Sequence, residues 1–197
     1  MHLLNIRRRH PVLAGLLAAL LLLAACAAPA SPTPAPLVPD DEGPAEVVDF
    51  PVQLYQGADA LGKESLPFSE VLAQGRPVML NFWAAECPAC RLEMPDLEAL
   101  HEEYGDRLLV FGLDVGPFLG MGTEAEGRAM LQEMAVTFPA GTTSDAAIIR
   151  TYQVLGTPTA YFIRTDGTVM QKWTGRLRPE PMKQFADELV RSSAPAD

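Results

Sequence analysis

The sequence predicts an α/β fold, a central mixed β-sheet with helices on both faces and an N-terminal strand or hairpin extension. Two observations carry this prediction. The apolar run at residues 78–83 is followed by a helical pattern and a second apolar run at 108–114, and such a strand–helix–strand unit has parallel strands and a right-handed crossover. Later, two further strands are joined by Asp166-Gly167, a strong hairpin signal that adds antiparallel pairs.

Residues 1–25 have the composition of a secretory signal peptide. Arg7, Arg8 and Arg9 form a basic start, and the apolar core at 12–23 is shorter than the ~20 residues of a typical membrane span. Its end, Leu23-Ala24-Ala25-Cys26, resembles the bacterial lipobox, in which a lipid is attached to the cysteine. The alternative is an ordinary signal peptide with Cys26 uninvolved. Both imply export, to an environment where disulfide chemistry matters.

Residues 26–45 are expected to be a disordered tether that follows the lipidated Cys26. Prolines recur there among alanine, serine and threonine, and such a composition favours extended conformations without a core. We therefore expect one folded domain at residues 46–192 and a disordered tail at 193–197. No internal repeat and no second domain is evident.

The elements expected within this domain follow from hydrophobic periodicity and from breaks at glycine and proline. Buried strands are expected where apolar runs are continuous, helices where apolar residues recur every three or four positions, and loops where glycine and proline cluster. In order, we expect an opening strand or hairpin at 47–50 and 52–55, a turn and short helix at 65–73, a strand at 78–83, a helix at 88–104, a strand at 108–114, a loop at 116–122, helices at 124–136 and 146–152, strands at 159–163 and 168–173, and a final helix at 179–190.

The chemistry of the chain is expected at Cys87-Pro88-Ala89-Cys90, between the strand at 78–83 and the helix at 88–104. A cysteine at a helix N-terminus meets unpaired N–H groups and the helix dipole, which favour a thiolate. Cys90 is within disulfide reach about one turn later. Cys87 can therefore attack a foreign disulfide, and Cys90 can resolve the mixed disulfide.

Composition excludes several other functions. The formal net charge is −10, which argues against nucleic acid and against anionic lipid surfaces as partners. Beyond the leader only Cys87, Cys90 and His101 are available as soft ligands, whereas a structural zinc site needs about four. We expect no metal and no cofactor.

Four segments resemble thioredoxin-fold proteins, and more narrowly the membrane-tethered TlpA/ResA group of thiol–disulfide oxidoreductases. They are Leu80-Asn81-Phe82-Trp83-Ala84 before the cysteine pair, Arg91-Leu92-Glu93-Met94-Pro95 after it, Gly156-Thr157-Pro158-Thr159 before a strand, and the hairpin from Tyr161 to Gly167. The resemblance covers about residues 46–192 and implies a thioredoxin-like fold.

The resemblance also implies roles for individual residues. Pro158 should be a cis-proline facing the disulfide, and the Thr157 backbone should pair with a substrate segment. Trp83 and Pro88 belong to the same substrate site. Glu93 matches a glutamate that helps to move protons, one helical turn beyond Cys90; the alternative is a solvated helix acid. Asn81 stands where cytoplasmic thioredoxins have a buried aspartate.

One residue departs from the family pattern. Glu86 directly precedes Cys87, where the family usually has tryptophan. A carboxylate there disfavours the thiolate and therefore the reduced form, which makes the pair a better reductant. The change also leaves the usual substrate surface in doubt.

The leading hypothesis is a lipid-anchored reductant of protein disulfides on the outer face of the cytoplasmic membrane or the periplasmic side. Resemblance suggests apocytochrome c or an oxidase assembly factor as substrate and a transmembrane thiol reductase as electron donor. A single short domain on a tether suggests a monomer. The alternatives are a disulfide oxidase or isomerase of exported proteins and a Cu(I)-carrying assembly protein. Peroxidase activity is less expected, because Cys87 lacks the usual surroundings.

Overall fold

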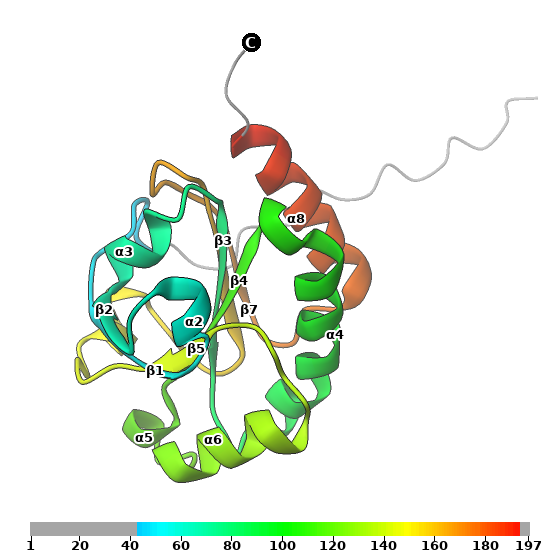
Figure 1. The fold of residues 1–197 in the computed structure, drawn as a ribbon. Helices are drawn as coiled ribbons and strands as arrows, with labels where there is room; N and C mark the ends of the chain where they lie inside the picture. The colour runs from blue at the N-terminus through cyan, green and yellow to red at the C-terminus, as the bar shows by residue number, and fades with distance from the viewer. Residues whose placement is uncertain (1–42, 194–197) are drawn as a thin grey trace, which may run out of the picture. The chain divides into compact units, whose positions relative to one another are not determined.

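Seven strands form one mixed sheet in the order β2-β1-β5-β4-β3-β6-β7 (Figure 1). The structure is a computed structural model that describes residues 43–193. These belong to a compact unit of residues 38–197; the other unit, residues 1–37, lies outside the described residues. The elements are β1 (Pro51–Gln56), α2 (Ala58–Leu61), β2 (Ser65–Pro67), α3 (Phe68–Leu72), β3 (Val78–Trp83), α4 (Pro88–Tyr104), η1 (Gly105–Arg107), β4 (Leu109–Asp114), α5 (Gly116–Leu119), α6 (Glu124–Glu133), β5 (Ala140–Thr142), α7 (Ile148–Thr151), β6 (Thr159–Ile163), β7 (Val169–Thr174) and α8 (Pro179–Ser193).

The centre of the sheet is the parallel pair β3 and β4, connected by α4. Every residue of both strands is buried, which explains their continuous apolar runs, since parallel strands are covered on both faces. β6 and β7 continue the sheet as an antiparallel hairpin beside β3. The expected mixed sheet is therefore confirmed.

Helices cover both faces of the sheet, as expected (Figure 1). One core joins α4, α6 and α8 to the sheet and contains Met79 and Trp83 of β3. The other joins α2, α3 and α7 and contains Val78, Leu80 and Phe82. Because side chains alternate along a strand, Asn81 shares the face of Met79 and Trp83 and points toward α4.

Several elements differ from the sequence expectation. The opening strand exists as β1, but its expected hairpin partner at 47–50 forms no strand. β1 instead pairs antiparallel with β2, which lies in the segment expected to be a turn and short helix. β5 was not expected, because Ala140-Gly141-Thr142 has no periodicity. It exists because β1 and β4 both pair with it, and a Cβ on Gly141 would lie 2.4 Å from Gln53 O. α2 and α5 are single turns within segments that were expected to be irregular.

The predicted segments nearest the N-terminus cannot be compared with the structure. The signal peptide, Cys26 and most of the tether lie outside the described residues. Within residues 43–193, no helix is both long enough and apolar enough to cross a membrane.

Candidate active site

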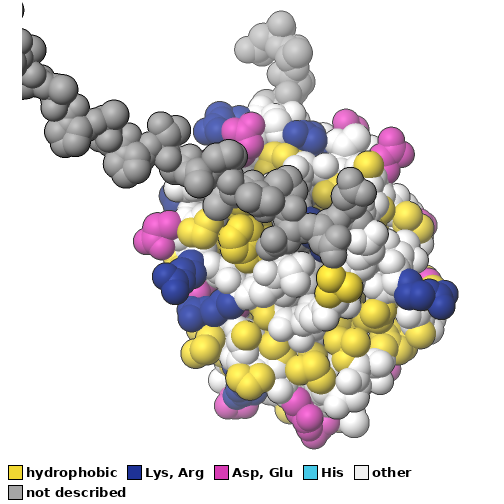
Figure 2. Space-filling model, turned by 180° about the vertical axis from the view of Figure 1, so that it is seen from behind, with side chains coloured by type: hydrophobic (Ala, Val, Ile, Leu, Met, Phe, Trp, Pro, Cys, Tyr) yellow, Lys and Arg dark blue, Asp and Glu magenta, His cyan; other side chains and the backbone are white. Residues whose placement is uncertain are grey.

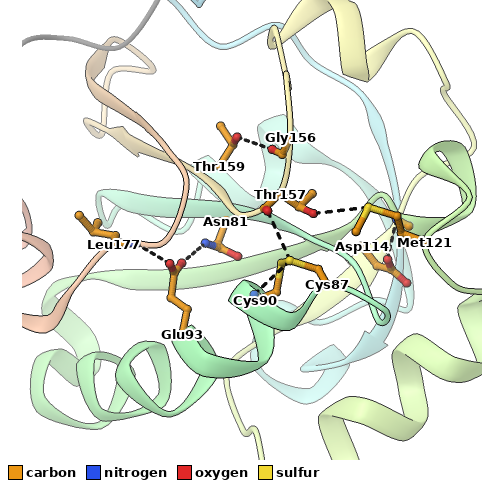
Figure 3. Close-up of a disulfide and its surroundings, with 11 residues drawn as sticks. Asn81, Cys87, Cys90, Glu93, Asp114, Met121, Gly156, Thr157, Thr159 and Leu177 are labelled. Carbon is orange, nitrogen blue, oxygen red and sulfur yellow. Dashed lines mark hydrogen bonds between the residues drawn. A yellow bond between two sulfur atoms is a disulfide. The ribbon is translucent and has the colours of Figure 1, made fainter.

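Cys87 and Cys90 form a disulfide at the N-terminal end of α4, directly after the central strand β3 (Figure 3). Cys87 is the helix N-cap, with extended backbone angles, and Pro88 occupies the first turn, where its missing N–H costs nothing. Cys90 N donates to Cys87 Sγ at 3.0 Å. The turn therefore holds Cys87 where a helix N-terminus stabilises a thiolate, as the sequence predicted.

The loop before β6 covers the outer side of the disulfide. Cys87 Sγ lies 3.3 Å from Thr157 O, and the Thr157–Pro158 peptide bond is cis, which confirms the expected isomer. Cys87 is 2% exposed and Cys90 1%, so little of the disulfide reaches the surface. Within the described part of the chain, Thr157 makes no hydrogen bond to another backbone group, which leaves its N–H available to another chain.

Glu93 lies below the disulfide as a buried acid rather than a solvated one. It is 1% exposed, and it accepts hydrogen bonds from Asn81 Nδ2 at 2.8 Å and from Leu177 N at 2.6 Å. Burial raises the pKa of Glu93 to about 7, although these two hydrogen bonds oppose the shift. A carboxyl that titrates near neutral pH suits proton transfer.

The rim of the site is apolar with one unpaired acid. Glu86 and Pro88 are exposed, and no ion pair of residues 43–193 includes Glu86. The nearby cations are already engaged, since Arg91 pairs with Glu133 at 2.6 Å and Arg176 with Asp96 at 3.3 Å. Trp83 is fully buried beneath the site. It therefore supports the cysteine turn from the core and offers no surface in this conformation.

Sequence reasoning did not identify the loop that packs against the turn before Cys87. Met121 O accepts a hydrogen bond from Glu86 N at 3.1 Å, and Met121 Sδ lies 4.0 Å from Thr157 Oγ1. Asp114, at the end of β4, holds the base of this loop by accepting from Gly116 N at 2.9 Å. The sequence did contain one signal of this loop: Asp114, an acid at the end of the apolar run 108–114.

Apolar side chains surround this end of the domain. Figure 2 shows them gathered over the lower part of the rear face, the end at which α5 and α6 lie in Figure 1. Phe118, Leu119 and Met121 are partly exposed, and Leu155, two residues before Thr157, is 72% exposed. Among the described residues, no group of three or more histidine, cysteine or acidic side chains is placed to hold a metal ion.

The model of the AhpC/TSA family matches residues 45–172, which include the disulfide, Glu93 and the cis-proline. The chain belongs to the AhpC/TSA family.

The chain is also similar to curated proteins, several of them named thiol–disulfide oxidoreductases. The chain is 27% identical over 138 residues to the thiol–disulfide oxidoreductase ResA of Oceanobacillus iheyensis, covering 70% of this chain and 69% of that protein. It is 33% identical over 115 residues to the thioredoxin-like protein YneN of Bacillus subtilis, covering 58% and 66%. The matches thus span about two thirds of these relatives' length.

Solved structures agree on the fold. StoA from Bacillus subtilis superposes with a TM-score of 0.57 at 17% identity, covering 72% of this chain and 98% of that one. The exposed lipoprotein thioredoxin of Streptococcus pneumoniae gives a TM-score of 0.60 at 23% identity, covering 72% and 100%. The expected thioredoxin-like fold is confirmed, and the chain is an enzyme of the thiol–disulfide oxidoreductase class.

Proposed function

We propose that this protein is an extracytoplasmic, membrane-anchored reductant of protein disulfides. The observation that carries the direction is the charge around Cys87. Its sulfur accepts one backbone N–H, Glu86 beside it is an unpaired acid, and the nearby cations Arg91 and Arg176 are neutralised by their own partners. The helix N-terminus favours the Cys87 thiolate, whereas the Glu86 carboxylate opposes it, so the reduced pair gives up its electrons more readily than a pair without this acid.

The reaction proceeds in two exchanges. The thiolate of Cys87 attacks one sulfur of the substrate disulfide, which forms a mixed disulfide and releases the other substrate sulfur as a thiolate. Cys90 then attacks Cys87 Sγ, which forms the intramolecular disulfide and releases the second substrate thiol. The substrate gains two electrons and two protons, and the enzyme is left in the oxidised form that the structure shows.

The substrate segment is proposed to lie along Thr157 and cis-Pro158 as an added strand. The Thr157 backbone supports this arrangement, because its carbonyl oxygen lies 3.3 Å from Cys87 Sγ and it has no backbone partner among the described residues. Pro88 and Glu86 border the segment on the helix side, and Trp83 supports the turn from within the core. Glu93 serves as the proton-transferring group, because it is buried near Cys90 and titrates near neutral pH.

We propose further that a lipid on Cys26 tethers the domain to the membrane, and that it acts as a monomer. The family resemblance suggests apocytochrome c or an oxidase assembly factor as substrate, and a transmembrane thiol reductase as the donor that restores the dithiol. The name of the pneumococcal structural neighbour, an exposed lipoprotein, is consistent with this location.

The reduction potential of the Cys87–Cys90 pair tests the proposal. The full-length protein and the Glu86→Gln variant are equilibrated in dithiothreitol or glutathione buffers, and the disulfide fraction is measured. We expect a potential near or below roughly −250 mV. An exposed charge is worth ~0.2–1 kcal/mol, so Glu86→Gln should raise the potential by about 5–20 mV, less at high salt. Glu102→Gln, an exposed acid far along α4, is the matched control.

Other outcomes would replace the proposal. A potential of roughly −120 to −180 mV is that of disulfide-forming and isomerising enzymes, and it would reverse the direction of electron flow. Tight Cu(I) binding without a reversible dithiol–disulfide equilibrium would make the protein a copper carrier. A Cys90→Ala variant, which cannot resolve the mixed disulfide, then identifies the substrate by covalent capture.

A further inference from the structure

The side-chain oxygen of Asn81 is buried and has no hydrogen-bond partner among residues 43–193. Its nitrogen is engaged, since Nδ2 donates to Glu93 Oε1 at 2.8 Å. Asn81 is 1% exposed, and a buried acceptor without a donor costs free energy. An orphaned oxygen of this kind in the interior requires an explanation.

The oxygen points toward the cysteine pair. In Figure 3 the amide lies between Glu93 and the disulfide, with its nitrogen toward Glu93 and its oxygen on the side of the disulfide. This orientation follows from the fold, because Asn81 is on the face of β3 that meets α4, and Cys90 and Glu93 are one turn apart on the buried side of α4. Both Glu93 oxygens accept hydrogen bonds, so the amide nitrogen faces Glu93 and the oxygen is directed away from it.

In the oxidised state the cysteine pair has no hydrogen to offer to Asn81. A disulfide sulfur carries no hydrogen, so Cys90 cannot donate to Asn81 in this structure. Reduction places a hydrogen on Cys90, which then becomes a donor beside the unpaired oxygen. Cys87 has partners of its own, Cys90 N at 3.0 Å and Thr157 O at 3.3 Å, so it does not compete for the amide.

We propose that Asn81 is a positioning residue that couples the proton of Cys90 to the proton of Glu93 by turning its amide over. With Cys90 as a thiol, the Asn81 oxygen accepts from Sγ–H and the nitrogen donates to the Glu93 carboxylate. With Cys90 as a thiolate, the amide is reversed, so the nitrogen donates to sulfur and the oxygen accepts from the protonated Glu93. Every group has a partner in both states, and in neither state is more than one of the two groups charged.

The resolving step moves one proton and two electron pairs. The proton of Cys90 is transferred to Glu93 as the amide reverses. The electron pair of the Cys90 thiolate forms the bond to Cys87 Sγ, and the pair of the bond between Cys87 and the substrate leaves on the substrate sulfur. Glu93 then returns the proton to the departing thiolate or to water. The Asn81 oxygen is again without a donor, as in the structure.

The charges around Glu93 allow this exchange at neutral pH. Burial raises the pKa of Glu93 to about 7 and Asp96 of the same helix adds to the rise, while the Leu177 N–H, Asn81 and Arg176 oppose it. Glu86 lies on the exposed side of the cysteine pair. A carboxyl balanced in this way accepts a proton from a thiol and releases it again without a large free-energy difference.

The proposal rests on disulfide exchange through Cys87 and Cys90 and not on the direction of electron flow. The reduction potential decides the direction, whereas the pH dependence of the resolving step decides the role of Asn81. The two can therefore fail independently.

The test separates the two exchanges in the full-length reduced protein. A symmetrical aryl disulfide releases one coloured thiolate when Cys87 attacks and a second when Cys90 resolves, and both releases are recorded against pH by stopped flow. We expect Asn81→Leu to slow the second release about tenfold or more, since a hydrogen bond to a charged group is lost, and to leave the first within about twofold. In the wild-type background, Glu93→Gln should shift the pH midpoint of the second release. In the Asn81→Leu background, adding Glu93→Gln should leave that midpoint unchanged.

An unchanged second release in Asn81→Leu would overturn the proposal. So would effects of Asn81→Leu and Glu93→Gln that multiply independently in the double variant. Thr142→Val, another buried polar residue of the sheet, is the control for a merely structural change, and it should leave the midpoint in place. Should Asn81→Leu fail to fold, Asn81→Ser, too short to contact both partners, is expected to give the same loss.

Discussion

At the scale of single residues, the site depends on one acid held in an environment that disfavours its charge. Glu93 is 1% exposed, yet its two oxygens accept from Asn81 and from the Leu177 N–H. Those hydrogen bonds favour the carboxylate, while the loss of water disfavours it. The net effect raises the pKa of Glu93 from 4.5 to about 7, so both protonation states are accessible when the enzyme works.

This shift predicts how stability depends on pH. The pKa of Glu93 is higher in the native state than in the unfolded chain, so between pH 4.5 and 7 the native state binds more protons. Stability therefore falls as pH rises through this range. A shift of this size is worth roughly 3 kcal/mol in total. Glu93→Gln should therefore flatten the stability profile in this range, measured by urea unfolding of the oxidised protein between pH 4.5 and 8.

A residual slope is expected in the Glu93→Gln variant, because burial also raises the pKa of Asp114 to about 6. Glu102→Gln, an exposed acid of the same helix, should keep the full slope. A Glu93→Gln profile that is parallel to wild type would show that this carboxyl does not titrate in the range assigned to it.

Residue identities alone predicted part of this site. The spacing of Cys87 and Cys90 was sufficient for the disulfide, because the two cysteines are one helical turn apart, whereas the cis bond at Pro158 followed only from the family resemblance. The contact from Leu177 N to Glu93 joins residues 84 positions apart, and no local pattern reports such a distance. The same holds for Met121 against Glu86, since both partners are irregular segments.

At the scale of elements, the turn between β3 and α4 is held by the loop that follows β4. Gly116 and Gly122 allow the close approach: a Cβ on Gly116 would lie 3.2 Å from Ala84 Cβ, and one on Gly122 would lie 2.9 Å from Ala85 Cβ. The loop therefore supports the backbone that precedes Cys87 along two short stretches. Long apolar strands such as β3 were predictable, whereas this loop and β5 depend on tertiary pairing.

Gly122→Ala should loosen this support. Gly122 has φ +110, and the added methyl would also meet Ala85, so we expect a loss of about 2–4 kcal/mol in unfolding free energy. The rate at which Cys87 attacks a disulfide should fall as well, because the turn that positions it is displaced. Urea unfolding and the first release of the aryl disulfide assay measure the two effects.

Gly120→Ala is the matched comparison. Gly120 also has positive φ, +65, but a Cβ there meets nothing within 4 Å, so the variant should carry backbone strain of about 1–2 kcal/mol without slowing Cys87. Equal rates of attack in the two variants would mean that contact between the loop and Ala85 is irrelevant to the site.

At the scale of the whole molecule, the chain is proposed to combine an exported, lipid-anchored leader with one redox domain. The described residues form a sheet covered on both faces, and all of the chemistry lies at one end of its central strand. The sequence predicted this architecture well, because continuous apolar runs and a hairpin turn specify strands directly. Cys26 and the tether lie outside the described residues, so the anchor stays a prediction.

Replacing Cys26 tests the anchor. Cys26→Ser should move the protein from the membrane fraction to the soluble extracytoplasmic fraction, because the thiol that carries the lipid is gone, and its reduction potential should stay that of wild type. Cell fractionation with immunodetection measures the distribution. The control is Cys90→Ala, which alters the redox pair only and should remain in the membrane fraction. If Cys26→Ser also remained in the membrane fraction, a lipid on Cys26 would be excluded.

The small opening above Cys87 has a consequence for how the enzyme meets its partners. Cys87 is only 2% exposed, and in the proposed cycle the same sulfur attacks the substrate and is attacked by the donor. Substrate and donor therefore require the same entrance and exclude each other. In the proposed cycle the enzyme therefore binds substrate and donor in turn at one site, and the partner that dissociates more slowly limits the turnover rate.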